Sequence, residues 1–330
     1  MWDAIVESLR AHRRFLIATH LNPEQDAIGS QVALLEILRA MGKEAIAWNT
    51  SRTPVGCRFL DPSSEIREWK SAAEEDELLA WADAAVLLDV NTWSHLGEVG
   101  AAIRRSRLPK ILIDHHRGGD DDIADVKVTD TSAAATGVLI YELALALGAS
   151  LTPSIASALY AAILVDTGSF RYANADARAL EAAAALVRAG AAPEALYREV
   201  FENKSWARLR LLPLALGSVR SDAGGKIAWM TISQAMFREA GAVEEDCDRF
   251  VDEVRGVRGV EACGVFRETE SGSVKATLRS NGRVDVHRVA TRFGGGGHRL
   301  AAGATVAGPL EPAVAQFIAA LREQLAPTGS

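Results

Sequence analysis

Residues 110–116, Lys-Ile-Leu-Ile-Asp-His-His, join a short apolar run to an acid and two imidazoles. The β-branched run is typical of a buried strand. In open α/β sheets, polar groups that follow such strands gather at the carboxyl edge of the sheet, where these folds place their sites. The alternative is structural, because an Asp at a strand end often caps the following turn. Asp114, His115 and His116 are therefore the first candidates for a functional site.

Three other stretches end an apolar run in the same way and favour the functional interpretation. They are His20-Leu21-Asn22-Pro23-Glu24-Gln25-Asp26, Leu87-Leu88-Asp89 and Val165-Asp166-Thr167-Gly168. Four such endings on one sheet would converge into a cluster of carboxylates and imidazoles. That set of donors suits a hydrolytic centre with two metal ions.

Around these stretches, apolar strands alternate with helices, which indicates a doubly wound, mainly parallel α/β sheet. Strands are expected at 14–19, 43–48, 84–89, 110–113 and 125–129, and helices at 26–41, 132–147 and 153–165. The pattern from 176 to 222 is helical throughout. A smaller α/β set follows, with strands at 226–232, 259–268 and 273–280 and helices at 244–255, 285–293 and 310–325. The sequence therefore predicts a first domain at 1–187, a helical linker at 188–222 and a second domain at 223–330.

The composition narrows the class of protein. Single cores seldom grow beyond roughly 250–300 residues, so a chain of 330 residues favours two domains. We find no apolar run of about 18 residues that would form a transmembrane helix, and the N-terminus lacks the pattern of a secretory signal. Three widely spaced cysteines form no zinc pattern, so we expect reduced thiols and a cytoplasmic location. A net charge of −7 disfavours coating of long nucleic acids but is compatible with a local basic pocket.

The first loop carries three potential metal ligands. His20, Glu24 and Asp26 lie on one turn that Pro23 stiffens. Mixed carboxylate and imidazole donors suit manganese, magnesium, iron or zinc, and a carboxylate-rich set favours manganese. Asp89 can bridge two ions about 3.5–4 Å apart, which acidify a bound water and attract a phosphoryl group. Each residue alone is more often a helix cap or a buried hydrogen-bond partner. Without a Ser-His-Asp order, an activated Cys or a P-loop pattern, metal-assisted hydrolysis is the favoured reaction class.

The ordered motifs resemble those of the DHH phosphoesterases, a family named for the triplet that stands here at 114–116. The first family motif resembles residues 20–30, the second resembles Asp89 with Leu96-Gly97, and the fourth resembles residues 166–171. A glycine-rich stretch extends the match to about residue 305. The resemblance implies a DHH catalytic domain at 1–187 and a DHH-associated, substrate-binding domain at 223–330. It also implies two Mn²⁺ ions per site, with Mg²⁺ as the alternative.

The resemblance implies a role for each motif residue. Asp114 would orient a neighbouring imidazole, His116 would face the substrate phosphate, and Arg171 would bind substrate. The expected ligands, with Asp89 shared, are His20, Glu24 and Asp89 for one ion and Asp26, Asp89, His115 and Asp166 for the other.

Two positions depart from the family pattern. Glu24-Gln25 stands where the family usually has Asp-Gly, so the ligand is one methylene longer and the turn loses the conformational freedom of glycine. His95 stands where many members have an Arg, and it would supply charge only when protonated. These departures keep open a catalytically weak member that binds nucleotides.

The second domain carries a candidate anion site at Gly294-Gly295-Gly296-Gly297-His298. Glycines expose backbone N–H groups, and we expect a helix to begin just after them, which suits an anion. Between Lys275 and Arg299 there are six basic residues and one acid. The alternative is a flexible glycine turn beside a solvated basic helix. The family resemblance implies that Gly295, Gly296, Gly297, His298 and Arg279 bind the terminal nucleotide of the substrate.

A chain of this length with only these two domains resembles the nanoRNase type of the family. The resemblance implies release of 5′-mononucleotides from short oligoribonucleotides and dephosphorylation of 3′-phosphoadenosine 5′-phosphate (pAp). Expected partners are short single-stranded RNA or dinucleotides and pAp, with no membrane association and with a homodimer as a further expectation. The alternatives are a cyclic-dinucleotide or linear-dinucleotide phosphodiesterase and the catalytically weak nucleotide-binding member. Cleavage polarity and the choice of RNA over DNA stay open.

Overall fold

The computed structural model describes residues 1–325, which form two compact units. The first unit is Met1–Asn203, and the second begins at Lys204. The boundary lies inside the expected linker at 188–222, whose role as a linker stays a prediction. Residues 326–330, the last of the expected domain at 223–330, lie outside the described part.

The first unit is built on a six-stranded sheet in which every neighbouring pair of strands is parallel. The strands, in the spatial order β3-β2-β1-β4-β5-β6, have the following bounds in chain order: β1 (Arg14–Thr19), β2 (Glu44–Asn49), β3 (Arg67–Glu68), β4 (Ala84–Leu88), β5 (Lys110–Asp114) and β6 (Val126–Thr129). The central strands are buried on both faces, which is why they read as continuous apolar runs. The order reverses between β1 and β4, and sheets of this kind bind ligands at such a switch point.

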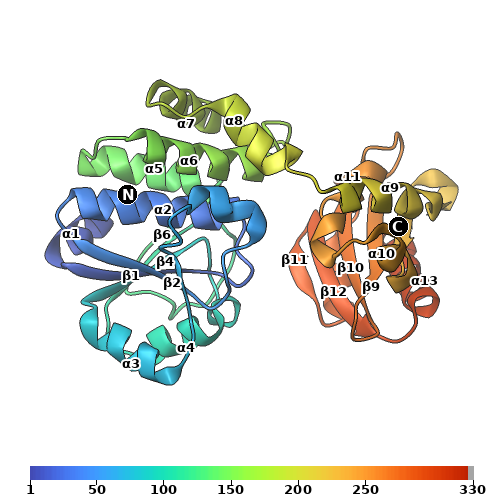
Figure 1. Cartoon of the computed structure of the whole chain (residues 1–330), viewed down its shortest axis with the longest axis horizontal. Helices are drawn as coiled ribbons and strands as arrows, with labels where there is room; N and C mark the ends of the chain where they lie inside the picture. Colours follow the sequence, from blue (N-terminus) through green and yellow to red (C-terminus); the bar gives the residue numbers. More distant parts are fainter. Residues whose placement is uncertain (326–330) are drawn as a thin grey trace, which may run out of the picture. The chain divides into compact units, whose positions relative to one another are not determined.

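Helices cover both faces of this sheet (Figure 1). One face carries α1 (Asp3–Ala11), α2 (Gln25–Ala40), α5 (Thr136–Leu147) and α6 (Pro153–Asp166). The other face carries α3 (Ala72–Trp81) and α4 (Gly97–Arg105). Outside α5 and α6 lie α7 (Ala177–Arg188), α8 (Pro193–Tyr197) and a π turn, Arg198–Glu202; short 3-10 turns occupy Val55–Leu60 and Trp93–His95. The predicted doubly wound parallel sheet is confirmed.

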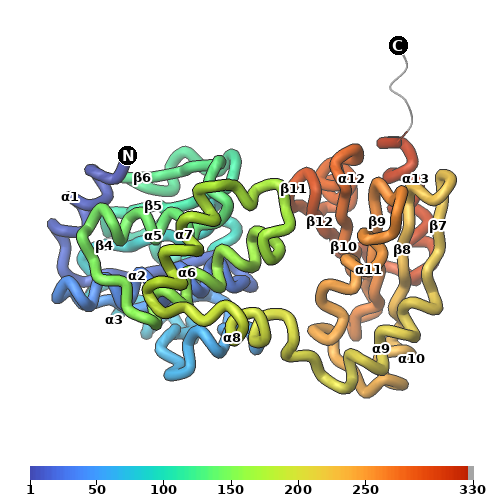
Figure 2. Tube along the Cα trace, turned by 90° about the horizontal axis from the view of Figure 1, so that it is seen from above, coloured from blue at the N-terminus to red at the C-terminus, as the bar shows by residue number. Residues whose placement is uncertain are grey.

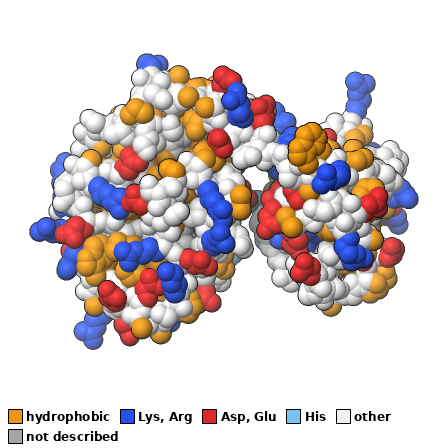
Figure 3. Space-filling view, viewed as in Figure 1, with side chains coloured by type: hydrophobic (Ala, Val, Ile, Leu, Met, Phe, Trp, Pro, Cys, Tyr) orange, Lys and Arg blue, Asp and Glu red, His pale blue; other side chains and the backbone are white. Residues whose placement is uncertain are grey.

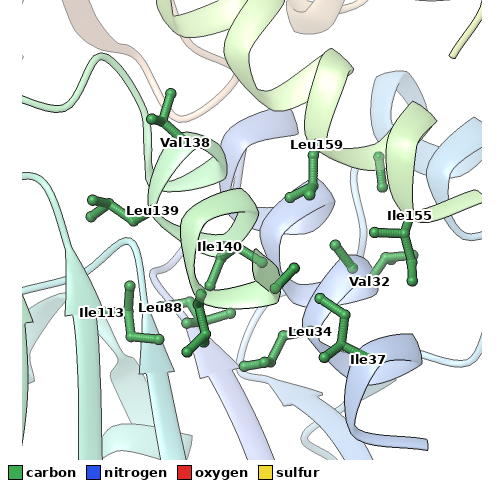
Figure 4. Close-up of a cluster of buried hydrophobic side chains, with 14 of the residues drawn as sticks. Val32, Leu34, Ile37, Leu88, Ile113, Val138, Leu139, Ile140, Ile155 and Leu159 are labelled. Atoms are coloured by element: carbon green, nitrogen blue, oxygen red, sulfur yellow. The ribbon is translucent and has the colours of Figure 1, made fainter. Parts of the chain in front are cut away.

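The core of the first unit lies between the sheet and helices α2, α5 and α6 (Figure 4). Leu88 and Ile113 point from neighbouring strands towards these helices, whereas Leu87 and Leu112 belong to the core on the opposite face. This alternation follows from the two-residue period of a strand. Helix α2 is buried on nearly all sides because it is covered by the sheet on one side and by α5 and α6 on the other.

The second unit contains a six-stranded mixed sheet with the order β11-β12-β10-β9-β8-β7 (Figure 2). Its strands are β7 (Arg220–Asp222), β8 (Ile227–Ile232), β9 (Ala262–Glu268), β10 (Ser273–Ser280), β11 (Gly296–His298) and β12 (Ala301–Ala307). Only the β8–β9 pair is parallel among these described strands. Its helices are α9 (Trp206–Gly217), α10 (Gln234–Ala240), α11 (Phe250–Arg255), α12 (Val286–Arg292) and α13 (Leu310–Leu325), with 3-10 turns at Ala223–Gly225 and Glu244–Cys247.

Three sequence-based expectations for this unit are wrong. The region 176–222 is not helical throughout, because its last residues form strand β7. The helix expected at 244–255 is interrupted, since Arg249 has a left-handed backbone with φ of +64°. The glycine run leads into strand β11, whose His298 pairs with Ala301 of β12, and not into a helix.

The surface carries both signs of charge. In the view of Figure 3, Lys and Arg side chains alternate with Asp and Glu side chains over the first unit. This mixed pattern agrees with the small acidic excess of the chain, −7. Among the helices of residues 1–325, none combines the length and apolar character needed to cross a bilayer.

Candidate metal centre

Five chain segments deliver the expected ligands to the carboxyl edge of the parallel sheet. His20 follows β1, Asp89 follows β4, and the DHH triplet ends β5. Asp26 lies in the first turn of α2. Asp166 is the last residue of helix α6 and does not follow a strand, which corrects the expectation of four strand endings. Helix ends and strand ends therefore build the cluster together.

His115 lies at the centre of the cluster. Its Nε2 is 3.7 Å from Asp26 Oδ2, 3.5 Å from Asp89 Oδ1 and 3.4 Å from Asp166 Oδ2. Its Nδ1 lies 3.2 Å from the carbonyl oxygen of Ala133, to which an Nδ1–H would donate. The buried Nε2 has no hydrogen-bond partner in the described chain. Buried polar atoms normally have a hydrogen-bond partner, so a buried, unpartnered nitrogen that faces three carboxylates is typical of a metal ligand.

The two carboxylate oxygens of Asp89 face different imidazoles. Oδ2 is 3.4 Å from His20 Nε2. Oδ1 is 3.5 Å from His115 Nε2 and accepts a 3.0 Å hydrogen bond from the Thr136 hydroxyl. The backbone at Asp89 has a φ of +56°, a conformation that costs free energy for a residue with a side chain. Asp89 thus has the arrangement of a carboxylate able to bridge two ions.

Asp26 is buried and caps a helix that is remote in sequence. Its Oδ2 and Oδ1 accept 2.8 Å hydrogen bonds from the backbone N–H groups of Thr136 and Gly137, respectively. These groups lie in the first turn of α5, where backbone donors lack partners within the helix. Asp26 can cap α5 and bind a metal ion at the same time, because each carboxylate oxygen has a further lone pair available.

Asp114 holds the second imidazole of the triplet. It is fully buried, and its Oδ1 lies 2.7 Å from His116 Nδ1 while its Oδ2 accepts from the backbone N–H of His116 at 3.1 Å. His116 Nδ1 also lies 3.7 Å from Asp89 Oδ1. Asp114 therefore fixes the orientation of the His116 ring through its Nδ1.

The crowded charges shift the pKa values in opposite directions. Burial alone would lower the pKa values of His20 and His115, but the charge of Asp89 outweighs it and raises them to about 9 and about 10. Burial and the neighbouring Asp89 raise the pKa of Asp26 to about 6, and burial with Asp26 raises that of Asp166. Although burial opposes it, the two imidazoles lower the pKa of Asp89. In the metal-free protein, the positive charges of protonated His20 and His115 therefore offset the negative charge of the neighbouring carboxylates, a role that a bound metal ion would take over.

Comparisons with known proteins agree with this geometry. A model described as the DHH family, N-terminal domain, matches residues 14–163, and a DHHA1 domain model matches 224–326. The chain is 35% identical over 95% of its length to the bifunctional oligoribonuclease and PAP phosphatase NrnA of Thermus thermophilus, of which it covers 90%. The chain belongs to the DHH family of phosphoesterases.

Two further relatives extend over nearly the whole chain. The NrnA protein of Bacillus subtilis is 26% identical, with 93% of each chain covered. The crystal structure of an exopolyphosphatase-related protein from Bacteroides fragilis superposes with a TM-score of 0.92 at 25% identity and covers 97% of this chain and 95% of its own. This DHH protein is accordingly a hydrolase with both units of the family fold.

The remaining motif positions surround the cluster less closely. Glu24 is exposed, precedes α2 and makes no side-chain capping bond, and its charge contributes to the raised pKa values of His20 and Asp166. Exposed His95 contributes its carbonyl oxygen, which accepts the N–H of Leu21 at 2.6 Å. The structure therefore gathers Asp26, Asp89 and Asp166 around His115, with His20 beside Asp89, and leaves Glu24 at the rim.

Arg171 lies on a tight left-handed turn that follows Asp166. Gly168, Ser169 and Phe170 have φ values of +57°, +62° and +60°. The Arg171 Nε donates to the Gly168 carbonyl oxygen at 2.8 Å, and its guanidinium lies 5.7 Å from the centre of the Tyr172 ring. The side chain is exposed and makes no ion pair among residues 1–325, so its positive charge is available to an anion.

In the second unit, strand register aligns the expected substrate residues. Ala301 of β12 lies opposite His298 of β11 on one side and opposite Arg279 of β10 on the other. Directly opposed residues share a face of a sheet, so the side chains of Arg279 and His298 project from the same face with a small alanine between them. Gly295, Gly296 and Gly297 lead into this row, and a Cβ at Gly297 would lie 2.6 Å from the Ala301 carbonyl oxygen.

Sequence reasoning did not identify Ala133, Thr136 and Gly137 as part of the site. Two of them act through backbone atoms, which leave no trace in a pattern of side chains. Thr136 had one signal, since it is a polar residue at the start of the apolar run of α5.

Proposed function

We propose that this DHH protein is a manganese-dependent phosphodiesterase that releases 5′-mononucleotides from short oligoribonucleotides and also dephosphorylates pAp. The observation that carries the proposal is the carboxylate of Asp89, whose two oxygens face different imidazoles in a cluster of four acids. The substrate class is taken from the NrnA relatives, which bear the name of bifunctional oligoribonuclease and PAP phosphatase.

The donors present suit two divalent cations. We assign His20, Glu24 and Asp89 to one ion and Asp26, Asp89, His115 and Asp166 to the other. The close approach of Asp26, His115 and Asp166 supports this assignment, as does the unpartnered Nε2 of His115. Carboxylate-rich sets with few imidazoles favour Mn²⁺, and Mg²⁺ is the alternative. When bound, two such ions supply an acidified water and stabilise negative charge on a phosphoryl group.

Two further side chains, His116 and Arg171, would act on the substrate phosphate. Asp114 holds His116 at Nδ1, so the ring, when it is protonated on both nitrogens, would donate its Nε2 proton to the leaving oxygen. Arg171 at the end of α6 supplies a positive charge for the phosphate, and a guanidinium suits a phosphate because its N–H groups form a planar fork.

The second unit supports recognition of a nucleotide. We propose that Arg279 and His298 bind the terminal nucleotide of the substrate, with Gly295 to Gly297 providing close backbone approach. The support is that both side chains project from one face of the sheet beside Ala301. A homodimer and a cytoplasmic location stay predictions, and light scattering of the purified protein tests the first.

Incubation of the metal-free protein with Mn²⁺ and 5′-labelled RNA of 2, 5 and 20 nucleotides tests the proposal, with pAp in a parallel reaction. We expect rapid loss of the two short substrates, a largely intact 20-mer, and release of phosphate from pAp. Preference for cyclic dinucleotides would contradict the proposed substrate. Binding of Mn²⁺ without hydrolysis of any of these esters would instead support a nucleotide-binding member and would point to Glu24-Gln25 as the reason.

A further inference from the structure

The chain segment that enters helix α5, residues 133–137, contacts several of the proposed ligands at once. The Ala133 carbonyl oxygen faces His115 Nδ1. The amide of Asn174 donates both to the Ala134 carbonyl oxygen, at 3.1 Å, and to the Asp166 carbonyl oxygen, at 3.0 Å. This α5 entry (residues 133–137) therefore links the two ligands that arrive from β5 and from α6.

Thr136 extends these links to the two acids that arrive from β4 and α2. It is fully buried. Its backbone N–H donates to Asp26 Oδ2 at 2.8 Å, and its hydroxyl donates to Asp89 Oδ1 at 3.0 Å. The same two oxygens face His115 Nε2. One residue thus orients two carboxylates towards the point that His115 also faces.

Close helix packing fixes the place of Thr136. The next residue, Gly137, has no space for a side chain, because a Cβ there would lie 2.6 Å from Ala162 Cβ and 3.3 Å from the Leu159 carbonyl oxygen. Both belong to α6, the helix that ends at Asp166. The start of α5 is therefore held against the helix that carries a ligand, so Thr136 has little freedom to move relative to the cluster.

We propose that Thr136 is a positioning residue of the metal centre, whose hydroxyl sets the rotation of the Asp89 carboxylate so that Oδ2 faces His20 and Oδ1 faces His115. The inference rests on the metal centre proposed above and not on the identity of the substrate. Hydrogen bonds to metal-binding carboxylates of this kind typically change metal affinity 10- to 100-fold.

The test compares Thr136→Val, Thr136→Ala and Thr136→Ser in the full chain by isothermal titration of the metal-free protein with Mn²⁺. Val keeps the volume, Ala removes the hydroxyl without adding bulk, and Ser keeps the hydroxyl. The matched control is Thr152→Val, because the Thr152 hydroxyl likewise donates to a carboxylate at a helix start, that of Glu36 at 3.3 Å, but lies at the opposite end of α6 from Asp166. Circular dichroism of each metal-free variant checks the fold.

We expect Val and Ala to weaken Mn²⁺ binding by about 10- to 100-fold, whereas Ser and the Thr152 variant bind as the wild type does. If Val does not fold, the pair of Ala and Ser decides the question. Equal Mn²⁺ affinity in Ala and Ser variants would overturn the inference, and so would a wild-type protein that binds no divalent cation. A wild type that binds Mn²⁺ but cleaves no RNA would contradict the proposed function alone, because the role of Thr136 is measured on the ion.

Discussion

Backbone strain at single residues marks the edge of the sheet where the cluster lies. Of seven residues other than glycine with positive φ in the described chain, four lie there: Asn22, Asp89, Ser169 and Phe170. Such conformations cost about 1–3 kcal/mol each and persist where the surrounding structure enforces them. Asp89 has this strained backbone directly after β4, and its carboxylate faces both His20 and His115. The strained residue is therefore also a proposed metal ligand.

Replacement of Asp89 by Asn tests the role of its charge in the cluster. Asp89→Asn keeps the shape and the acceptor for the Thr136 hydroxyl but removes the charge. We expect turnover of short RNA to fall by more than the roughly 10- to 100-fold that outer hydrogen-bonding partners contribute, with the fold retained. Asp83→Asn is the matched control, since Asp83 precedes the same strand at its opposite end and pairs with Arg14. Activity of Asp89→Asn equal to that of the control would exclude the bridging role.

A second prediction follows from the raised pKa values of His20 and His115, about 9 and about 10. Both imidazoles are protonated at pH 7.5 in the metal-free protein, and a metal ligand must be deprotonated. Binding of Mn²⁺ should therefore release about two protons from the imidazoles and strengthen as pH rises towards 9. Titration calorimetry in buffers with different ionisation enthalpies counts these protons.

The variant His20→Asn provides the control for this count and should release about one proton fewer. The folding stability of the metal-free protein should change with pH in the opposite direction to its Mn²⁺ affinity. The raised pKa values of His20 and His115 stabilise the folded state fully below the unfolded pKa of about 6.5, and this stabilisation is lost as the pH rises through about 9 to 10. Mn²⁺ binding that releases no protons would show that His20 and His115 are not ligands.

The tight contact between helices α2 and α6 determines how closely Asp26 and Asp166 approach. Gly29 is one turn after Asp26 in α2, and a Cβ there would lie 2.4 Å from the Ala158 carbonyl oxygen in α6. Backbone cannot move away cheaply, so Gly29→Ala should force the two helices apart. We expect a loss of about 1–3 kcal/mol in the free energy of unfolding and weaker Mn²⁺ binding.

Chemical denaturation and Mn²⁺ titration of Gly29→Ala measure both effects. Gly217→Ala is the control, because Gly217 is also helical but a Cβ there would meet nothing within 4 Å. Alanine favours a helix over glycine by about 1 kcal/mol, so the control should be neutral or slightly stabilised. A stabilised Gly29→Ala would show that the contact between α2 and α6 has room to adjust.

The elements also show what the sequence was able to predict. The apolar runs at 14–19, 84–88 and 110–113 followed by acids and imidazoles identified the central strands and most of the cluster, because strand burial and polar ends both leave side-chain signals. The hairpin of β11 and β12 was missed, since glycine has low strand propensity and a glycine run equally precedes helices. The α5 entry was missed because its bonds to Asp26 and His115 come from backbone atoms.

The two units of the chain carry opposite charges at their candidate sites. The first unit gathers acids that a cation would neutralise, whereas the second presents Arg279 and His298 from one sheet face, on a stretch that holds six basic residues and one acid. Catalysis and substrate recognition should therefore respond separately to substitution. Ala301 lies between these two side chains, so a substitution there should affect substrate recognition without affecting the metal centre.

We predict that Ala301→Leu raises the KM for short RNA by at least about tenfold, since a single extra methylene in a binding pocket already changes discrimination by about 10- to 200-fold. Mn²⁺ affinity should stay unchanged, because every proposed ligand belongs to the first unit. Thr305→Leu is the matched control: Thr305 lies four residues further along β12 on the same face, opposite Lys275, roughly 13 Å from Ala301. Initial rates over a range of RNA dinucleotide concentrations separate KM from kcat. An unchanged KM together with an unchanged kcat in Ala301→Leu would remove the row of Arg279, Ala301 and His298 from the substrate site. A lower kcat with an unchanged KM would instead assign that row to a step after binding.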